Sequence, residues 1–255
     1  MTRAATERPF LPPLVGFGTL LLVLAVIEAL IAGGAINAFV VPRPTQIAAA
    51  LPRIVAEENV VGRFGQTALE VLWASLMLAV IGVGLGMLLY RFRLLRRATE
   101  TWVAAFASAP IVLMYPLFLV IFGRSATTIV MIGFAAGLAP VILKTLEGLA
   151  GTRQVLVNVG RSFRLRDAQL FGKILLPAAL PTIFVGLRLG LIFAMINIVG
   201  VEFLINFGGL GQLINELAER YDLPGTYGAI LFVILVSVVF FWVTEKLERW
   251  LRPGT

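Results

Sequence analysis

The sequence GTRQVLVNVGRSFRLRDAQLFGKILLPAALP occupies residues 151–181 and decides how the rest of the chain must be arranged. Its charged residues stand between two long apolar runs, at Arg153, Arg161, Arg164, Arg166, Asp167 and Lys173. A charged interruption of this length is too costly to place among lipid tails. We therefore expect it to lie in water or against a water-soluble partner, between segments that cross a membrane.

Composition predicts an all-α polytopic membrane protein. Of the 255 residues, 59% are hydrophobic and 14% are charged, whereas a soluble domain has about a quarter charged residues. In such a chain the net charge of +7 reports the orientation of basic loops, and we expect membrane lipid rather than nucleic acid as its surroundings. The absence of cysteine and histidine excludes thiol catalysis, disulfides and histidine-bound metal. We expect no catalytic residue, cofactor or metal site in this chain.

Apolar stretches of about 20 residues suit a bilayer, and the chain offers six, at 14–32, 67–90, 102–122, 127–146, 183–203 and 229–242. The first follows basic residues as a signal peptide would, but it is long enough to span and we expect it to be retained. The predicted organisation is a cytoplasmic tail (1–13), a first span (14–34), an outer-face segment (35–66), a core holding spans two to six (62–246), a cytoplasmic loop between spans four and five (151–181) and a cytoplasmic tail (247–255).

The basic residues predict the orientation. Arg43, Arg53, Arg63, Arg124 and Arg220 fall outside under this assignment, Arg188 falls in the fifth span, and the rest of the 21 Lys and Arg fall inside. Such a bias places both termini in the cytoplasm. We therefore expect a multi-pass membrane protein.

The second span contains GVGLG, with glycines at 82, 84 and 86. A nucleotide-binding loop would follow a strand, whereas this motif lies inside an apolar helix. Small residues that let helices approach closely explain it better. The chain also lacks the full phosphate-loop motif, since Gly172-Lys173 is followed by Ile174 and has no upstream glycine at the required spacing.

Residues 151–181 predict two short amphipathic helices. Val155, Val159 and Phe163 recur every four residues, and Asn158 and Arg161 fall on another face. The RLRD sequence at 164–167 predicts a turn, with Asp167 either capping the second helix or in its first turn. Pro177 and Pro181 bracket the return to the membrane. Periodicity alone leaves two interpretations equally open: a surface loop that holds spans together, or a docking element for a partner.

This stretch resembles the cytoplasmic loop of permease subunits of bacterial ATP-binding-cassette importers. That loop reads Glu-Ala-Ala, three residues, Gly, nine residues, then Ile-x-Leu-Pro. Here 158–160 (Asn-Val-Gly) take the first place, Arg164 takes the glycine place, and Ile174, Leu176 and Pro177 match the end. The segments VPRPTQIAAAL (41–51), APIVLMYPLFLVIFG (109–123) and LPAALPTIFVGLRLGL (176–191) are similar to the nitrate, sulfonate and taurine subgroup.

The resemblance implies the type I importer permease fold, a place in the bacterial inner membrane and a role in transport rather than catalysis. Two permease copies would form the substrate pathway, most simply as a homodimer, and two cytoplasmic ATPase subunits would bind the loops. ATP and Mg would be bound by those ATPases, and an extracytoplasmic binding protein would deliver substrate. The residues that the resemblance and the periodicity assign to coupling are Val155, Asn158, Val159, Gly160, Arg161, Phe163, Arg164, Asp167, Ile174, Leu176 and Pro177.

Two positions depart from the family pattern. A glycine at 164 would accept a positive φ, and an arginine there would cost on the order of 1 kcal/mol. We therefore expect the turn to be right-handed or shifted by one residue. Asn158 offers only neutral hydrogen bonds where the family has an acid, so Arg161 is expected to take more of the partner contact.

Pathway candidates are the polar or helix-breaking residues of the spans. Pro110 and Pro116 should break the third span, with Met114, Tyr115 and Pro116 at the broken point as a gate or a packed kink. Asn197 is either a contact between helices or a pathway residue, and Glu202 either lines an outer vestibule or pairs with an outer arginine. Glu28 and Arg188 lie near span ends, where hydrogen bonding or snorkelling explains them.

Two other functions compete with the importer permease. An ion-coupled secondary transporter needs titratable residues along its pathway, and the spans offer few. A membrane enzyme needs clustered acid, base or metal ligands, and Glu147 and Asp167 have no evident partners for that. The resemblance to the subgroup leaves the substrate between a small organic or inorganic anion and a heteroaromatic vitamin or precursor.

Overall fold

The computed structural model describes residues 11–251, with side-chain surroundings for 14–246, and is helical without strands across that range. The predicted terminal tails at 1–13 and 247–255 lie outside the residues whose side-chain surroundings are described. The elements are α1 (Leu11–Ala32), α2 (Pro44–Glu57), α3 (Val60–Met77), η1 (Leu78–Gly82), α4 (Val83–Arg91), α5 (Arg93–Ala107), η2 (Ile111–Met114), α6 (Tyr115–Phe122), α7 (Ala126–Ala150), α8 (Gln154–Ser162), α9 (Asp167–Leu170), η3 (Phe171–Leu175), α10 (Leu176–Ile205), α11 (Gly209–Glu219) and α12 (Leu223–Leu251).

Within the described residues, five helical segments are long and apolar enough to cross a membrane, and a bent pair gives a sixth crossing if counted as one span. The five are Leu14–Ala32, Val60–Arg91, Ala126–Ala150, Asp167–Ile205 and Leu223–Lys246. This confirms the all-α polytopic fold. The sixth is α5 with η2 and α6, whose axes differ by 93°.

The third span breaks at one place only. The helix ends at Ala107, and the backbone leaves helical geometry through Ser108, Ala109 and Pro110 before η2 begins. Pro116 does not break the span, because it lies in the first turn of α6, where a proline has no hydrogen bond to lose. The break is therefore N-terminal to Met114–Pro116, where we expected the broken point.

The fifth span is longer than the sequence indicated. Helical backbone runs without a gap from Asp167 to Ile205 through α9, the π-helical turn η3 and α10. The expected second short helix of the loop is thus the beginning of this span. Pro177 does not interrupt it, because it lies at the start of α10 directly after the wide turn η3.

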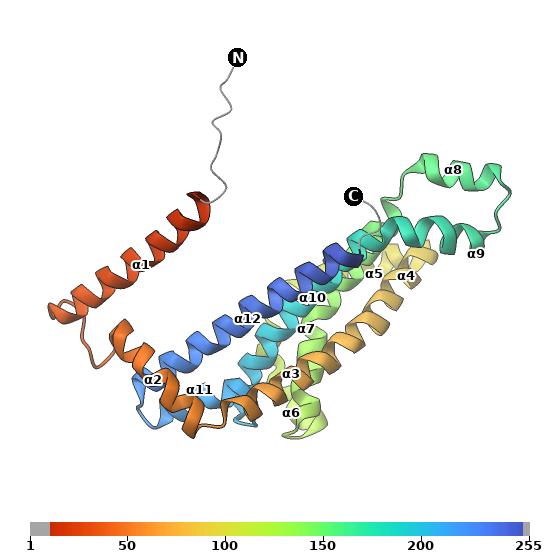
Figure 1. Cartoon of the computed structure of the whole chain (residues 1–255). Coiled ribbons are helices and arrows are strands. Elements are labelled where there is room, and N and C mark those ends of the chain that lie inside the picture. The colour runs from red at the N-terminus through yellow and green to blue at the C-terminus, as the bar shows by residue number, and fades with distance from the viewer. Residues whose placement is uncertain (1–10, 252–255) are drawn as a thin grey trace, which may run out of the picture.

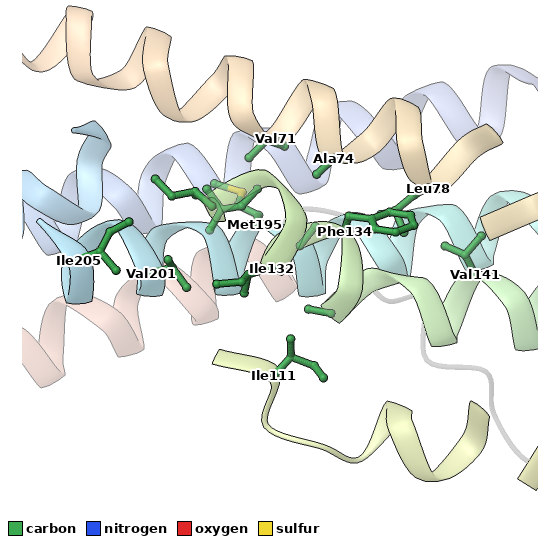
Figure 2. Packing of buried hydrophobic residues seen from close by; sticks show 14 residues of the cluster. Val71, Ala74, Leu78, Ile111, Ile132, Phe134, Val141, Met195, Val201 and Ile205 are labelled. Carbon is green, nitrogen blue, oxygen red and sulfur yellow. The ribbon is translucent and has the colours of Figure 1, made fainter. Parts of the chain in front are cut away.

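The core lies where α3, α7 and α10 pack together, and α7 and α10 form the most extensive pairing of the bundle. Figure 2 shows Val71, Ala74 and Leu78 directed from α3 and η1 toward Ile132, Phe134 and Met195. Ile111, at the break of the third span, points into the same cluster from the other side. Gly137 and Gly190 let α7 and α10 approach so closely that a Cβ at either would collide with the other's carbonyl oxygen.

The packing explanation for GVGLG holds for two of its three glycines. A Cβ at Gly82 would lie 2.9 Å from a Val141 side-chain atom, and one at Gly86 would lie 2.5 Å from the Cβ of Thr145. Gly84 faces open space, with nothing within 4 Å of such a Cβ. The motif therefore seats the second span against α7.

The bundle has two distinct ends (Figure 1). The loop formed by α8 and its flanking residues projects from one end, near the junction of α4 and α5. α2 and α11 cover the opposite end, and α1 stands apart from the bundle and approaches it through α2. Glu28 of α1 accepts hydrogen bonds from the backbone N–H and the hydroxyl of Thr45 in α2, at 3.2 and 2.9 Å. This confirms Glu28 as a hydrogen-bonded end residue.

Candidate functional site

Helix α8 presents an apolar face to solvent at the end of the bundle. Val155 and Phe163 are 70% and 77% exposed, and Val159 and Leu156 are also exposed between them. The backbone of α8 is hydrogen-bonded at both ends, so this face belongs to a formed helix and not to a frayed segment. Exposed apolar side chains grouped on one helix of a projecting loop are typical of a protein interaction site.

A second face of α8, at Gly160, anchors the loop to the start of the fifth span. A Cβ at Gly160 would collide with the methyl groups of Ile174 and Leu170, at 2.5 and 2.6 Å. Glycine is therefore needed at 160 for close approach. Ile174 and Leu176 pack inward, while Pro177 is exposed at the start of α10. The matched end of the family motif thus packs against α8 and holds it in place.

The turn after α8 is left-handed at Arg164, which corrects the expected right-handed or shifted turn. Arg164 has φ +53°, its N–H donates to the carbonyl of Arg161, and the N–H of Leu165 donates to the carbonyl of Gly160. These two bonds define the helix-ending motif that normally places glycine in the left-handed position. Arg164, which stands in the family's glycine place, therefore has a backbone conformation that favours glycine.

The polar residues of the loop lie away from its apolar face. Asn158 accepts a hydrogen bond from the side chain of Gln154, 3.1 Å away on the preceding turn, and Arg161 is exposed. Asp167 is the first residue of α9 and is exposed, so it is the first-turn acid, and Arg166 takes the capping position. A carboxylate there interacts favourably with the helix dipole.

A cavity of about 460 Å³ lies at the break of the third span, against α10 and Ala136 of α7. Residues 106–110, which include Phe106 and Ser108, form one wall. Phe193, Asn197 and Gly200 form the wall from α10. Non-helical backbone at membrane depth is tolerated where it lines such a cavity.

Some of the pathway residues predicted from the sequence line this cavity, and others do not. Pro110 and Asn197 both line it, although they are 87 positions apart in the sequence. Asn197 donates to the carbonyl of Phe193 on its own helix, at 2.8 Å, so this bond does not join two helices. Met114, Tyr115 and Pro116 are not among the residues that line the cavity.

Glu202 is fully buried, so neither the vestibule nor the arginine pairing fits. Its carboxylate accepts hydrogen bonds from the Thr67 hydroxyl at 2.7 Å and from the Gly211 N–H at 2.8 Å. Thr67 in turn accepts the N–H of Leu210 at 2.9 Å. Glu202 therefore fastens the N-terminus of α11 to α3 and α10, where a helix dipole favours an acid.

Sequence reasoning missed the α3 side of this cluster. Glu70 is buried beside Glu202, and Gln66 donates to Glu70 at 3.4 Å and to the Phe207 carbonyl at 3.3 Å. Gln66, Thr67 and Glu70 are polar residues on neighbouring turns near the start of an apolar span. That pattern was the signal, because intramembrane polar residues rarely lack a specific partner.

Ion pairs join the elements at the α2 and α11 end. Arg53 pairs with Asp222 at 2.5 Å, Arg63 with Glu216 at 2.6 Å, and Arg220 with Glu58 at 2.7 Å. Burial opposes ionisation of Asp222, but hydrogen bonds from Arg53 and the Gly225 N–H and the charge of Arg53 lower the pKa of Asp222 below its usual value. Arg124 donates to the carbonyls of Ile205 and Asn206 at the end of α10.

Comparison with known proteins agrees with this architecture. The family described as "Binding-protein-dependent transport system inner membrane component" matches residues 79–253, and the chain belongs to this family. It is accordingly the permease subunit of an ATP-binding-cassette importer, a multi-pass component of the inner membrane. The alternative of an ion-coupled secondary transporter has no support from these matches.

The chain is 28% identical over 204 residues to an ABC transporter permease protein of Brucella melitensis, covering 80% of this chain and 81% of that protein. It is 25% identical to the formylaminopyrimidine transport permease protein of Halalkalibacterium halodurans, covering 84% and 86%. It is 30% identical to the nitrate import permease protein of Synechocystis, covering 69% and 64%. An inward-facing structure of the MetNI methionine ABC transporter shares the fold, with a TM-score of 0.65 at 20% identity over 74% of this chain and 94% of that one.

Proposed function

We propose that α8 is the element through which this permease is coupled to cytoplasmic ATPase subunits. The observation that carries the proposal is the exposed apolar face of Val155, Val159 and Phe163 on a helix held out from the end of the bundle. Such a face costs free energy in water, at about 25 cal/mol per Å² of apolar surface, and a cleft on a partner would remove that cost. The full phosphate-loop motif is absent from the sequence, so ATP and Mg belong to the partner.

The orientation follows from the same proposal. If α8 meets a cytoplasmic ATPase, the end of the bundle where α4 joins α5 is also cytoplasmic. Four arginines lie at that junction, at 91, 93, 96 and 97, and the positive-inside rule places such basic segments in the cytoplasm. Both termini then lie in the cytoplasm, and α2 and α11 face the extracytoplasmic binding protein. Each importer would hold two ATPases and two permeases, the second permease being a copy of this chain.

The substrate pathway is proposed to pass the cavity at the break of the third span. Pro110 shapes one wall and Asn197 offers a polar group on the other. The described lining comes from α5, the break, η2, α7 and α10, so one copy supplies one side of the pathway and the second copy would complete it. Glu202 has a structural role instead, because its oxygens are committed to Thr67 and Gly211.

Co-purification tests the coupling proposal. The affinity-tagged permease is expected to retain its ATPase subunit in detergent, and Val159→Asp and Phe163→Asp are expected to lose it, because each puts a charge into a contact that would be buried. Gln154→Asp is the matched control, since it adds the same charge to α8 away from the apolar face. Retention of the ATPase by both folded variants would show that α8 is not the docking element.

A further inference from the structure

The cavity at the break of the third span combines aromatic and neutral polar groups. Phe106 and Phe193 supply rings, Ser108 supplies a hydroxyl, and Asn197 supplies an amide. Among the residues that line it in the described structure, every side chain is uncharged. One amide hydrogen of Asn197 is used on the carbonyl of Phe193, and an amide also has a second hydrogen and an acceptor oxygen.

Arginines that could balance the charge of an anion have other contacts in the described structure. Arg124, at the outer end of α6, donates to the carbonyls that end α10. Arg53, Arg63 and Arg220 pair with acids at the α2 and α11 end. Within the spans, Arg188 lies over the ring of Phe241 in α12, 5.4 Å from its centroid. These arginines neutralise acids, end a helix or stack on a ring.

The lining selects between the two substrate classes left open by the sequence. Moving an anion from water into an uncharged cavity costs several kcal/mol unless cations or converging donors replace its hydration, and anion pores accordingly use Lys or Arg. A neutral planar ring loses little hydration, gains stacking against aromatic side chains, and can exchange hydrogen bonds with an amide and a hydroxyl. A volume of about 460 Å³ falls within the range of small-molecule sites.

We propose that the cavity between the break at 108–110 and α10 selects neutral heteroaromatic substrates, with Phe193 stacking on the ring and Asn197 bonding to its polar edge. The proposal rests on the proposed function, because it takes this cavity as part of the transport pathway. The two larger grooves, beside α12, have no amide in their lining. Their hydroxyls, on Ser237 in one and on Thr67 and Ser75 in the other, donate to other groups of the protein.

Uptake by cells that carry the whole transporter tests the proposal. The neutral ring probes are riboflavin and formylaminopyrimidine. The probes of other classes are the anions nitrate and ethanesulfonate and the zwitterion glycine betaine. Uptake of a ring probe is expected to depend on this chain and on ATP, and to fall at least tenfold in Asn197→Ala and in Phe193→Ala. Leu204→Ala is the control, because Leu204 is exposed on the same helix and outside the cavity.

The outcomes separate the two proposals. Chain-dependent uptake of nitrate, ethanesulfonate or glycine betaine without a ring probe overturns the substrate class but leaves the importer intact. Uptake of neither ring probe also overturns it. Ring-probe uptake that is unchanged in both variants, at equal protein in the membrane, overturns the assigned cavity. If the ATPase does not co-purify with the permease, the coupling proposal is wrong and the substrate proposal is unaffected by that result. Uptake in cells that lack the ATPase would show independently that the coupling proposal is wrong.

Discussion

Arg164 is an arginine at a backbone position that favours glycine. It holds the left-handed conformation at φ +53° that ends α8, and two backbone hydrogen bonds fix the turn around it. A non-glycine residue pays about 1–2 kcal/mol for that conformation. The hydrogen-bonded turn and the packing of Gly160 against Ile174 offset this cost.

Replacing Arg164 by glycine is therefore expected to stabilise the turn by on the order of 1 kcal/mol. The amide hydrogen of Leu165, bonded to the Gly160 carbonyl, should then exchange roughly fivefold more slowly. Arg161→Gly is the control, because Arg161 is helical and glycine there should destabilise α8 by about 1 kcal/mol. Equal effects of the two substitutions would contradict the left-handed turn.

Glu202 gives a second prediction at the scale of one residue. Glu202→Ala leaves the Gly211 N–H buried without its acceptor, at about 1–3 kcal/mol, and leaves the Thr67 hydroxyl only the longer bond to the Arg63 carbonyl at 3.3 Å. Thermal unfolding of the purified protein should therefore move to a clearly lower temperature. Glu202→Gln keeps an acceptor oxygen and should lose less, and Glu219→Ala, at an exposed site, should change stability by less than about 0.5 kcal/mol. Equal losses in Glu202→Ala and Glu219→Ala would remove the structural role.

At the scale of the elements, close packing of spans depends on which side a glycine faces. Gly86 faces Thr145 and the Ile142 carbonyl of α7, whereas Gly84, on the same helix, faces open space. Gly86→Ala should destabilise the protein by about 1–3 kcal/mol through overpacking. Gly84→Ala should be neutral or stabilising by up to about 1 kcal/mol, because alanine is the better helix former. Thermal unfolding of the two variants, in one detergent, would refute the packing role if their order were reversed.

Sequence patterns predicted the elements that depend on local chemistry. Apolar length predicted the spans, and four-residue spacing predicted α8 and its exposed residues Val155, Val159 and Phe163. They could not place the end of the second loop helix, because Pro177 is tolerated after the wide turn η3. They also could not place Glu202, because its partners Thr67 and Gly211 come together only when α3, α10 and α11 pack.

The whole molecule is polarised, with the α8 loop at one end and the ion-paired α2 and α11 at the other (Figure 1). This polarity predicts which side of the membrane each loop occupies. The sequence contains no cysteine, so single cysteines can be added without background. Glu219→Cys should react with a membrane-impermeant maleimide in intact spheroplasts, and Asn158→Cys should react only after lysis. Reaction of both in intact spheroplasts would contradict the assigned orientation.

The central claim, that α8 contacts an ATPase, is tested most directly by photo-crosslinking in the assembled transporter. Benzoylphenylalanine in place of Phe163 is expected to form an adduct with the ATPase subunit. The same probe in place of Tyr221, which is 88% exposed in the turn between α11 and α12, is expected to form none. An ATPase adduct at 163 and not at 221 is the predicted result. No adduct at 163, or equal adducts at both positions, would contradict the claim.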